Sequence, residues 1–112
     1  MEKLRLVAFG DSTTAPREGV DCYAACLQRD LPGLGIQAEI HNAGVRGNTT
    51  ADGRARFVAD VLDRRPAIAI IQFGINDAAV DVWRQPPATG SRVSREQYAG
   101  NLAGFVGAGR VT

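Results

Sequence analysis

Ser12 is the side chain with the clearest capacity for chemistry in this sequence. It follows an apolar run at residues 6–9 that stops at Gly10, and a short apolar run bounded by glycine predicts a buried strand. Ser12 then lies just past the carboxyl end of that strand, where open α/β sheets place their ligand crevice. A serine hydroxyl in this position is a candidate nucleophile, provided that an adjacent base takes its proton.

Two later stretches repeat the arrangement of a strand followed by a polar loop that contains glycine. The loop at residues 42–49 reads NAGVRGNT, and the loop at residues 74–77 reads GIND. Their residues also have ordinary structural interpretations: Ser12 as the cap of a turn or helix, Gly47 as a residue with positive φ, and Asn76 with the next residue as an N-cap pair. Three such junctions in order favour a functional site over three unrelated turns.

Periodicity and capping residues predict the elements that position these loops. Strands are expected at residues 4–9, 36–41 and 67–73, and helices at 21–30, at 51–64 and after a capping box formed by Ser94 and Gln97. Asp21 is the expected cap of the first helix, and Thr49 or Thr50 that of the second. Residues 107–112 are predicted to be the end of the third helix and the first residues of another strand.

The residue patterns also predict which faces are buried. The alternation of apolar and polar residues over 36–41 is typical of an edge strand with one wetter face. The nearly uninterrupted apolar run at 67–73 is typical of a strand covered on both faces. In the second helix one stripe is expected to face the core, formed by Phe57, Val58, Val61 and Leu62.

Alternating strands and helices imply parallel pairing with right-handed crossovers. The simplest arrangement is a three-layer α/β/α, flavodoxin-like parallel sheet in the order 2-1-3, with the three loops at one carboxyl edge. We expect this sheet to be incomplete on the side where a fourth strand would pair. Because a long apolar edge invites association, we expect a homodimer or a strand exchange along residues 67–73.

Three blocks in these loops resemble the SGNH or GDSL hydrolases, a family of esterases, lipases and acylhydrolases. Residues 9–13 (FGDST) resemble the nucleophile block, residues 42–49 the glycine block and residues 74–77 the G-x-N-D block. The resemblance covers almost the whole chain. It implies hydrolysis of a small-molecule carboxylic ester through an acyl-serine intermediate.

The resemblance gives a role to each candidate residue. Ser12 is the implied nucleophile. The backbone N–H groups of Ser12 and Gly47 and the side-chain amide of Asn76 are the implied oxyanion hole. Asp11 and Asp77 are expected to brace the loops by accepting backbone hydrogen bonds rather than to act as acids.

The sequence departs from the family in lacking the base. The family supplies a histidine and its orienting aspartate in a D-x-x-H block near the carboxyl end, and this sequence has no such block. Its one histidine, His41, precedes the second loop and alternates with Glu39 on the wetter face of its strand, which favours a surface or packing role. We therefore expect residues 1–112 to form a single SGNH-hydrolase-like domain whose carboxyl-terminal part is missing, weakly active or inactive alone.

Two other functions fit the same crevice. It could hold an acyl or acetylated-carbohydrate ligand without turning it over. A flavodoxin-like cofactor binder shares the start of the fold, but residues 12–16 (STTAP) lack the glycine of its phosphate loop, and no cofactor is expected. The G-x-S-x-G elbow of α/β-hydrolases is also absent, because Thr14 stands at its second glycine.

Charge, cysteine content and the first apolar run indicate which partners and which cellular location to expect. The 112 residues carry 13 Lys+Arg against 12 Asp+Glu without a basic run, which argues against nucleic acid and a membrane surface as partners. Cys22 and Cys26 make a poor zinc site and are expected to be buried and reduced, so no metal is expected. The first apolar run is too short for a signal peptide. The sequence therefore predicts a cytoplasmic protein, unless a leader has been removed.

Overall fold

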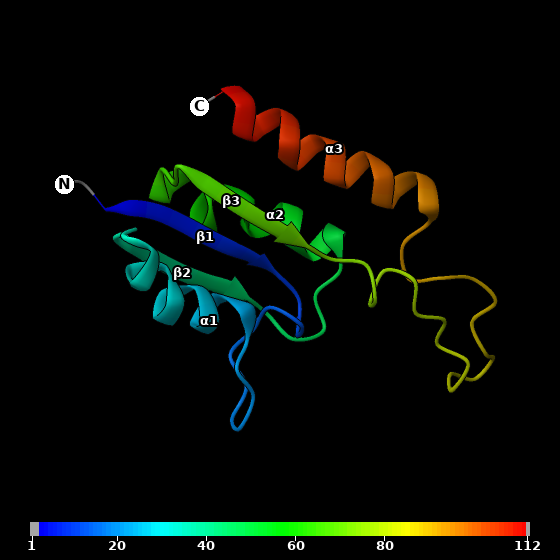
Figure 1. Ribbon diagram of the computed structural model, residues 1–112. Helices are drawn as coiled ribbons and strands as arrows, with labels where there is room; N and C mark the ends of the chain where they lie inside the picture. Colours follow the sequence, from blue (N-terminus) through cyan, green and yellow to red (C-terminus); the bar gives the residue numbers. More distant parts are fainter. Residues whose placement is uncertain (1–2, 112) are drawn as a thin grey trace.

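The computed structural model describes residues 3–111, which form a parallel sheet with helices on both sides (Figure 1). The strands are β1 (Leu4–Gly10), β2 (Ala38–Gly44) and β3 (Ile68–Gln72), and the α-helices are α1 (Tyr23–Asp30), α2 (Thr50–Asp60) and α3 (Arg95–Val111). Two short 3-10 helices, η1 (Leu31–Leu34) and η2 (Leu62–Arg64), follow α1 and α2.

The three strands run in one direction with β1 in the middle. Their order is β2-β1-β3, and Gly10 lies opposite both Gly44 and Gln72 in the parallel register. The strands in Figure 1 therefore end together, and the loops that follow them gather at one edge of the sheet. The predicted strand order, the parallel pairing and the edge position of the second strand are confirmed.

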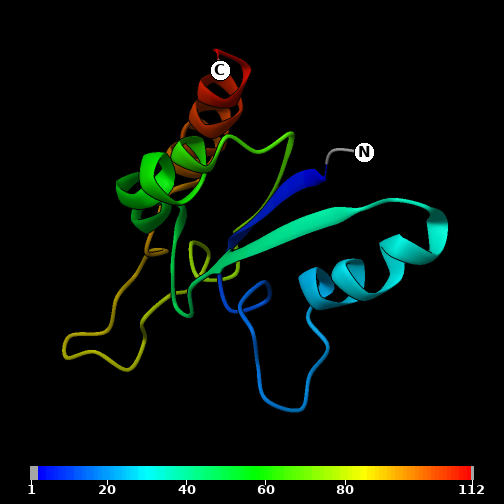
Figure 2. The same ribbon diagram turned by 90° about the vertical axis from the view of Figure 1, so that its left-hand side faces the viewer.

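Helix α1 lies on one side of the sheet, and α2 and α3 lie on the other (Figure 2). The core on the side of α2 and α3 is built around four phenylalanine rings, whose contacting pairs have centroids 4.9 to 6.0 Å apart: Phe9, Phe57, Phe73 and Phe105. Phe9 is completely buried. It directly precedes Gly10, so this aromatic core fixes the end of β1 that leads into the Ser12 turn.

Two predicted helix caps are confirmed. Thr49 caps α2 in a capping box with Asp52, in which the Thr49 hydroxyl accepts from the Asp52 N–H at 3.3 Å and the Asp52 carboxylate accepts from the Thr49 N–H at 2.9 Å. Ser94 and Gln97 form the box that opens α3. Because α2 starts directly after the loop that contains Gly47, its cap also fixes where that loop ends.

The first helix and the second strand differ from their predicted bounds. Helix α1 begins at Tyr23 without a side-chain cap, and the carboxylate of Asp21 pairs with Arg29 at 3.4 Å instead. Strand β2 begins at Ala38 and continues to Gly44, because it pairs with β1 along the full length of β1. The first residues of the predicted second loop are therefore strand.

The second helix is shorter than its periodicity predicts. Helix α2 ends at Asp60, and η2 follows. Phe57 and Val61 are buried, but Val58 is 58% exposed, so its prediction as a core residue is wrong. Successive helical residues are about 100° apart, which places Val58 beside the inward stripe and not on it.

Strand β3 is less covered than its apolar sequence predicts. Ile68 is 47% exposed, and no residue of β3 is fully buried. Within residues 3–111 the outer edge of β3 has no strand partner, and α1 packs at the opposite edge of the sheet, against β2. The prediction that this strand is covered on both faces is therefore wrong for the described part of the chain.

The carboxyl-terminal stretch is helical and does not begin a strand. Helix α3 continues through Gly107 and Gly109 to Val111, whereas Thr112 lies outside the described residues. Phe105 is buried and Leu102 packs against the same core. The packing of this apolar face of α3 against α2 and the sheet stabilises the helix, although its glycines by themselves would weaken it.

Candidate functional site

Three loops meet at the carboxyl edge of the sheet, and backbone hydrogen bonds join their first residues. The Val45 N–H donates to the Gly10 carbonyl at 3.0 Å, and the Asp11 N–H donates to the Gln72 carbonyl at 3.3 Å. The three sequence blocks therefore begin side by side, as the strand order predicts.

Ser12 lies in a tight turn that Asp11 holds together. The Asp11 carbonyl accepts from the N–H groups of Thr14 and Ala15 at 3.1 and 3.0 Å. Asp11 is 1% exposed, and its carboxylate accepts from the N–H and the hydroxyl of Thr13 at 3.0 and 2.7 Å. Ser12 itself is half-buried, and its hydroxyl has no hydrogen-bond partner among residues 3–111. The hydroxyl is therefore free to meet a ligand.

Two backbone amides at this edge are also free. In the described part of the chain the N–H groups of Ser12 and Gly47 donate to no acceptor. Gly47 has φ of +78°, a left-handed conformation that glycine adopts without a steric penalty. The Asn76 side-chain amide donates to the Asn48 carbonyl at 3.1 Å. The structure thus brings Asn76 against the loop of Gly47, and that loop against the end of β1.

Asp77 anchors the third loop to the start of α2. Asp77 is 2% exposed. Its carboxylate accepts from the Thr50 N–H, at 3.0 Å to each oxygen, and from the Thr50 hydroxyl. The same hydroxyl accepts from the Asn101 amide at 2.9 Å. A carboxylate at this end of a helix also interacts favourably with the helix dipole. Asp77 thus accepts backbone hydrogen bonds, as a bracing role requires.

The long loop after β3 is closed by an ion pair. Arg92 lies 2.8 Å from the Asp81 carboxylate, and the Val93 N–H donates to the Asp77 carbonyl at 3.1 Å. Hydrogen bonds from Arg92 hold the pKa of Asp81 below its usual range. These contacts return the loop to the vicinity of Asp77 and of the site.

Sequence reasoning missed that Gly44 lets the Ser12 turn lie directly on the sheet. A Cβ on Gly44 would lie 2.3 Å from the Ala15 nitrogen, and one on Gly10 would lie 2.4 Å from both the Thr14 hydroxyl and the Gln72 carbonyl. Side chains do not tolerate such distances. Only the register that places Gly44 beside Gly10 identifies it as a position of close approach.

Arg56 is the second residue that the sequence did not single out. Its guanidinium donates to the carbonyl groups of Gly10 and Ala43 and to the side chain of Asn48 at 2.7 to 2.9 Å. The one signal that the sequence gives for Arg56 is its i,i+4 spacing to Asp60. This spacing is typical of an ion pair on a helix surface and does not indicate a role at the site.

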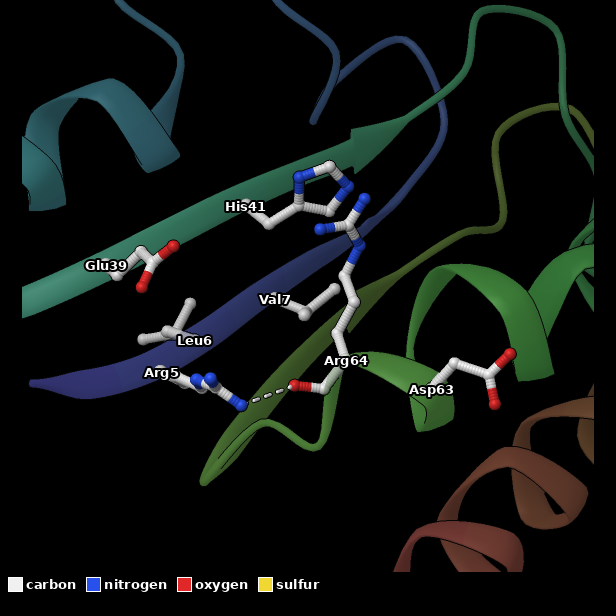
Figure 3. A pocket seen from close by; sticks show the side chains of 7 residues that line it. All are labelled: Arg5, Leu6, Val7, Glu39, His41, Asp63 and Arg64. Atoms are coloured by element: carbon white, nitrogen blue, oxygen red, sulfur yellow. Dashed lines mark hydrogen bonds between the residues drawn. The ribbon is translucent and has the colours of Figure 1, made fainter.

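His41 lies away from Ser12. It pairs in register with Val7, three residues before the end of β1, and is therefore about 10 Å back along the sheet from the edge. Figure 3 shows its ring beside Arg64 in a pocket over β1 and β2. Burial and the positive charge of Arg64 lower the pKa of His41, while Asp60 acts in the opposite direction. Among residues 3–111, no hydrogen bond or ion pair links His41 to Ser12.

The described residues form no cluster of side chains that could bind a metal ion. No group of three metal-ligating side chains gathers among residues 3–111. Cys22 and Cys26 are free thiols, but half-buried, so the prediction of full burial is wrong. None of the described helices combines the length and the apolarity needed to cross a bilayer.

An open parallel sheet with helices on both faces and a serine turn at its carboxyl edge defines a flavodoxin-like α/β/α protein. The sequence model of the GDSL-like Lipase/Acylhydrolase family matches residues 8–110. The chain belongs to this family, as its three sequence blocks predict.

Known relatives and solved structures agree with this assignment. The chain is 43% identical to the uncharacterized lipoprotein YqeF of Bacillus subtilis (strain 168), over 90% of this chain and 41% of that protein. It is 33% identical to an acetylxylan esterase of Geobacillus stearothermophilus, over 91% of this chain and 52% of that enzyme. The crystal structure of a lipase/acylhydrolase from Enterococcus faecalis superposes with a TM-score of 0.78 at 28% identity, covering 94% of this chain and 51% of that one. The chain thus spans about half the length of these proteins.

Proposed function

We propose that this chain supplies the nucleophile and the oxyanion-binding groups of a serine ester hydrolase. The observation that supports the proposal best concerns three groups at one edge of the sheet. Within residues 3–111 the Ser12 hydroxyl and the backbone amides of Ser12 and Gly47 have no hydrogen-bond partner. The carboxamide of Asn76, held against the Gly47 loop, is the third donor. Neutral donors of this kind stabilise an oxyanion without forming an ion pair in the ground state.

In the proposed reaction the Ser12 oxygen attacks the carbonyl carbon of the ester while a base takes the hydroxyl proton. The carbonyl oxygen becomes an oxyanion that accepts hydrogen bonds from the N–H groups of Ser12 and Gly47 and from Asn76. The C–O bond to the alcohol then breaks, and the alcohol leaves with the proton returned by the base. Water hydrolyses the acyl-serine and restores the hydroxyl.

Among residues 3–111 the Ser12 hydroxyl is hydrogen-bonded to no such base. His41 is the single histidine of the sequence and lies away from Ser12. We therefore expect the chain alone to show at most the residual catalysis of an oxyanion hole without its triad, about 10³–10⁴ over water.

Added imidazole should replace the missing base. We expect the hydrolysis of p-nitrophenyl acetate to rise with imidazole concentration beyond the rate of Ser12→Ala, and acetyl to accumulate on Ser12 in mass spectra. Asn76→Ala should lower the Ser12-dependent rate by about 10²–10³-fold, because one oxyanion donor is lost. Ser12→Ala is the matched control, since it keeps the reaction that imidazole catalyses in solution. Equal rates for wild type and Ser12→Ala at every imidazole concentration would contradict the proposal.

Ligand binding without turnover is the second candidate, and the position of His41 favours it. Because one relative is named an acetylxylan esterase, acetylated xylo-oligosaccharide is a suitable probe. Protection of the chain against thermal unfolding by this probe, with no acetate released even in the presence of imidazole, would support binding over hydrolysis.

The cytoplasmic location stays a prediction from the sequence. One relative of the chain is named as a lipoprotein.

We also propose that the free edge of β3 pairs with a second copy of the chain. The residues of β3 are all uncharged, so two antiparallel copies would place no like charges opposite each other. We expect light scattering at micromolar concentration to report a dimer. Ile68→Lys should give a monomer, because a charged side chain blunts a strand edge. Val58→Lys, at a similarly exposed position on α2, should leave the dimer intact. A monomeric wild type would overturn this proposal.

A further inference from the structure

We propose that Arg56 is a positioning residue that sets the placement of the Ser12 turn relative to the Gly47 loop. The inference rests on the proposed function for its effect on catalysis. Its effect on the two loops can be measured without any reaction.

The guanidinium of Arg56 connects the segments that carry the candidate site. Nη2 donates to the Gly10 carbonyl at 2.9 Å, at the point where β1 leads into the Ser12 turn. Nη1 donates to the Ala43 carbonyl at 2.7 Å, near the end of β2. Nε donates to the side chain of Asn48 at 2.8 Å, directly after Gly47. One side chain on α2 therefore contacts both the segment that leads into the Ser12 turn and the Gly47 loop.

The third loop is joined to the same assembly through Asn48. The backbone carbonyl of Asn48 accepts from the Asn76 amide at 3.1 Å, while its side chain accepts from Arg56. A shift of Asn48 would therefore move the Gly47 amide and the Asn76 carboxamide together. All three proposed oxyanion donors depend on the segments that Arg56 connects.

The geometry requires an arginine at this position. The guanidinium is planar and offers five N–H donors in a fixed fork, whereas a lysine ammonium is a point charge with three rotatable donors. The Arg56 side chain is 18% exposed and is paired with Asp60 at 2.9 Å. Its guanidinium carbon lies 4.5 Å from the centroid of the buried Phe9 ring. The ion pair and the aromatic face orient the fork, and its remaining donors hold the two loops.

The experiment compares Arg56→Lys with Arg54→Lys, a matched change two residues away whose arginine donates to Asn101 and to neither loop. We expect Arg56→Lys to shift the backbone amide resonances of residues 10–15 and 43–48 and to speed their hydrogen exchange. In the imidazole-assisted reaction it should lower the Ser12-dependent kcat about 100-fold, with KM unchanged, because small misplacements of reacting groups cost about this much. Arg54→Lys should change neither quantity.

Asn48→Ala tests the contact to the Gly47 loop separately from the contact to the Ser12 turn, and it replaces Arg56→Lys if that variant does not fold. It removes the Nε contact only, so we expect it to disturb residues 45–48 and to leave residues 10–15 in place. The inference is overturned if Arg56→Lys leaves the amides of both loops unchanged, or if Arg54→Lys perturbs them equally. Perturbed loops without any Ser12-dependent rate in the wild type would support the positioning role and reject the proposed hydrolase chemistry.

Discussion

Replacing Asp77 with alanine is expected to lower the free energy of unfolding by about 3 kcal/mol, because hydrogen bonds to buried charged acceptors contribute about 1.5–3 kcal/mol each. The Asp77 carboxylate accepts from both the N–H and the hydroxyl of Thr50, and all of these groups are buried. Without it, the Thr50 N–H in the first turn of α2 loses its partner. The loss of a buried partner is more costly than the loss of a surface contact. Chemical denaturation of wild type and variant measures the difference.

The matched control for this substitution is Asp63→Ala. Asp63 lies in η2 and is exposed, so its removal should change stability by less than about 0.5 kcal/mol. Asp77→Asn keeps one acceptor oxygen, so its loss in free energy of unfolding should lie between those of Asp77→Ala and Asp63→Ala. If Asp77→Ala and Asp63→Ala unfold at the same denaturant concentration, the buried network does not anchor the third loop.

A methyl group on Gly44 is expected to destabilise the chain by about 1–3 kcal/mol or more and to displace the Ser12 turn. The added Cβ would lie 2.3, 2.7 and 2.8 Å from three backbone atoms of Thr14 and Ala15. Backbone atoms cannot rotate away as the end of a flexible side chain can. Gly44→Ala should therefore lower the denaturation midpoint, shift the amide resonances of residues 11–15, and abolish the Ser12-dependent rate with imidazole.

Gly104→Ala is the control, because a Cβ at this position of α3 meets nothing within 4 Å. Alanine is favoured over glycine inside a helix by roughly 0.5–1 kcal/mol, so this variant should be slightly more stable than wild type. A Gly44→Ala variant as stable as Gly104→Ala, with an unmoved turn, would show that the turn can move away from the sheet at little cost.

Local sequence patterns determined much of the fold. The glycine after each apolar run marks the end of a strand, and Thr49 and Ser94 mark the starts of two helices, because caps and turns depend on residues a few positions apart. The alternation of strands and helices was sufficient to predict the parallel order and the edge at which the loops meet. The blocks at residues 9–13, 42–49 and 74–77 were sufficient to indicate the family.

Only the tertiary structure decided which neighbours these residues meet. It turned Arg56 inward onto Gly10 and Asn48, made Gly44 a position of close approach, and placed His41 back along the sheet from Ser12. It also left β3 half exposed, although its apolar sequence suggested cover on both faces. The physical reason is that periodicity encodes which face of an element is apolar. Strand register and the packing of distant segments decide what lies against that face.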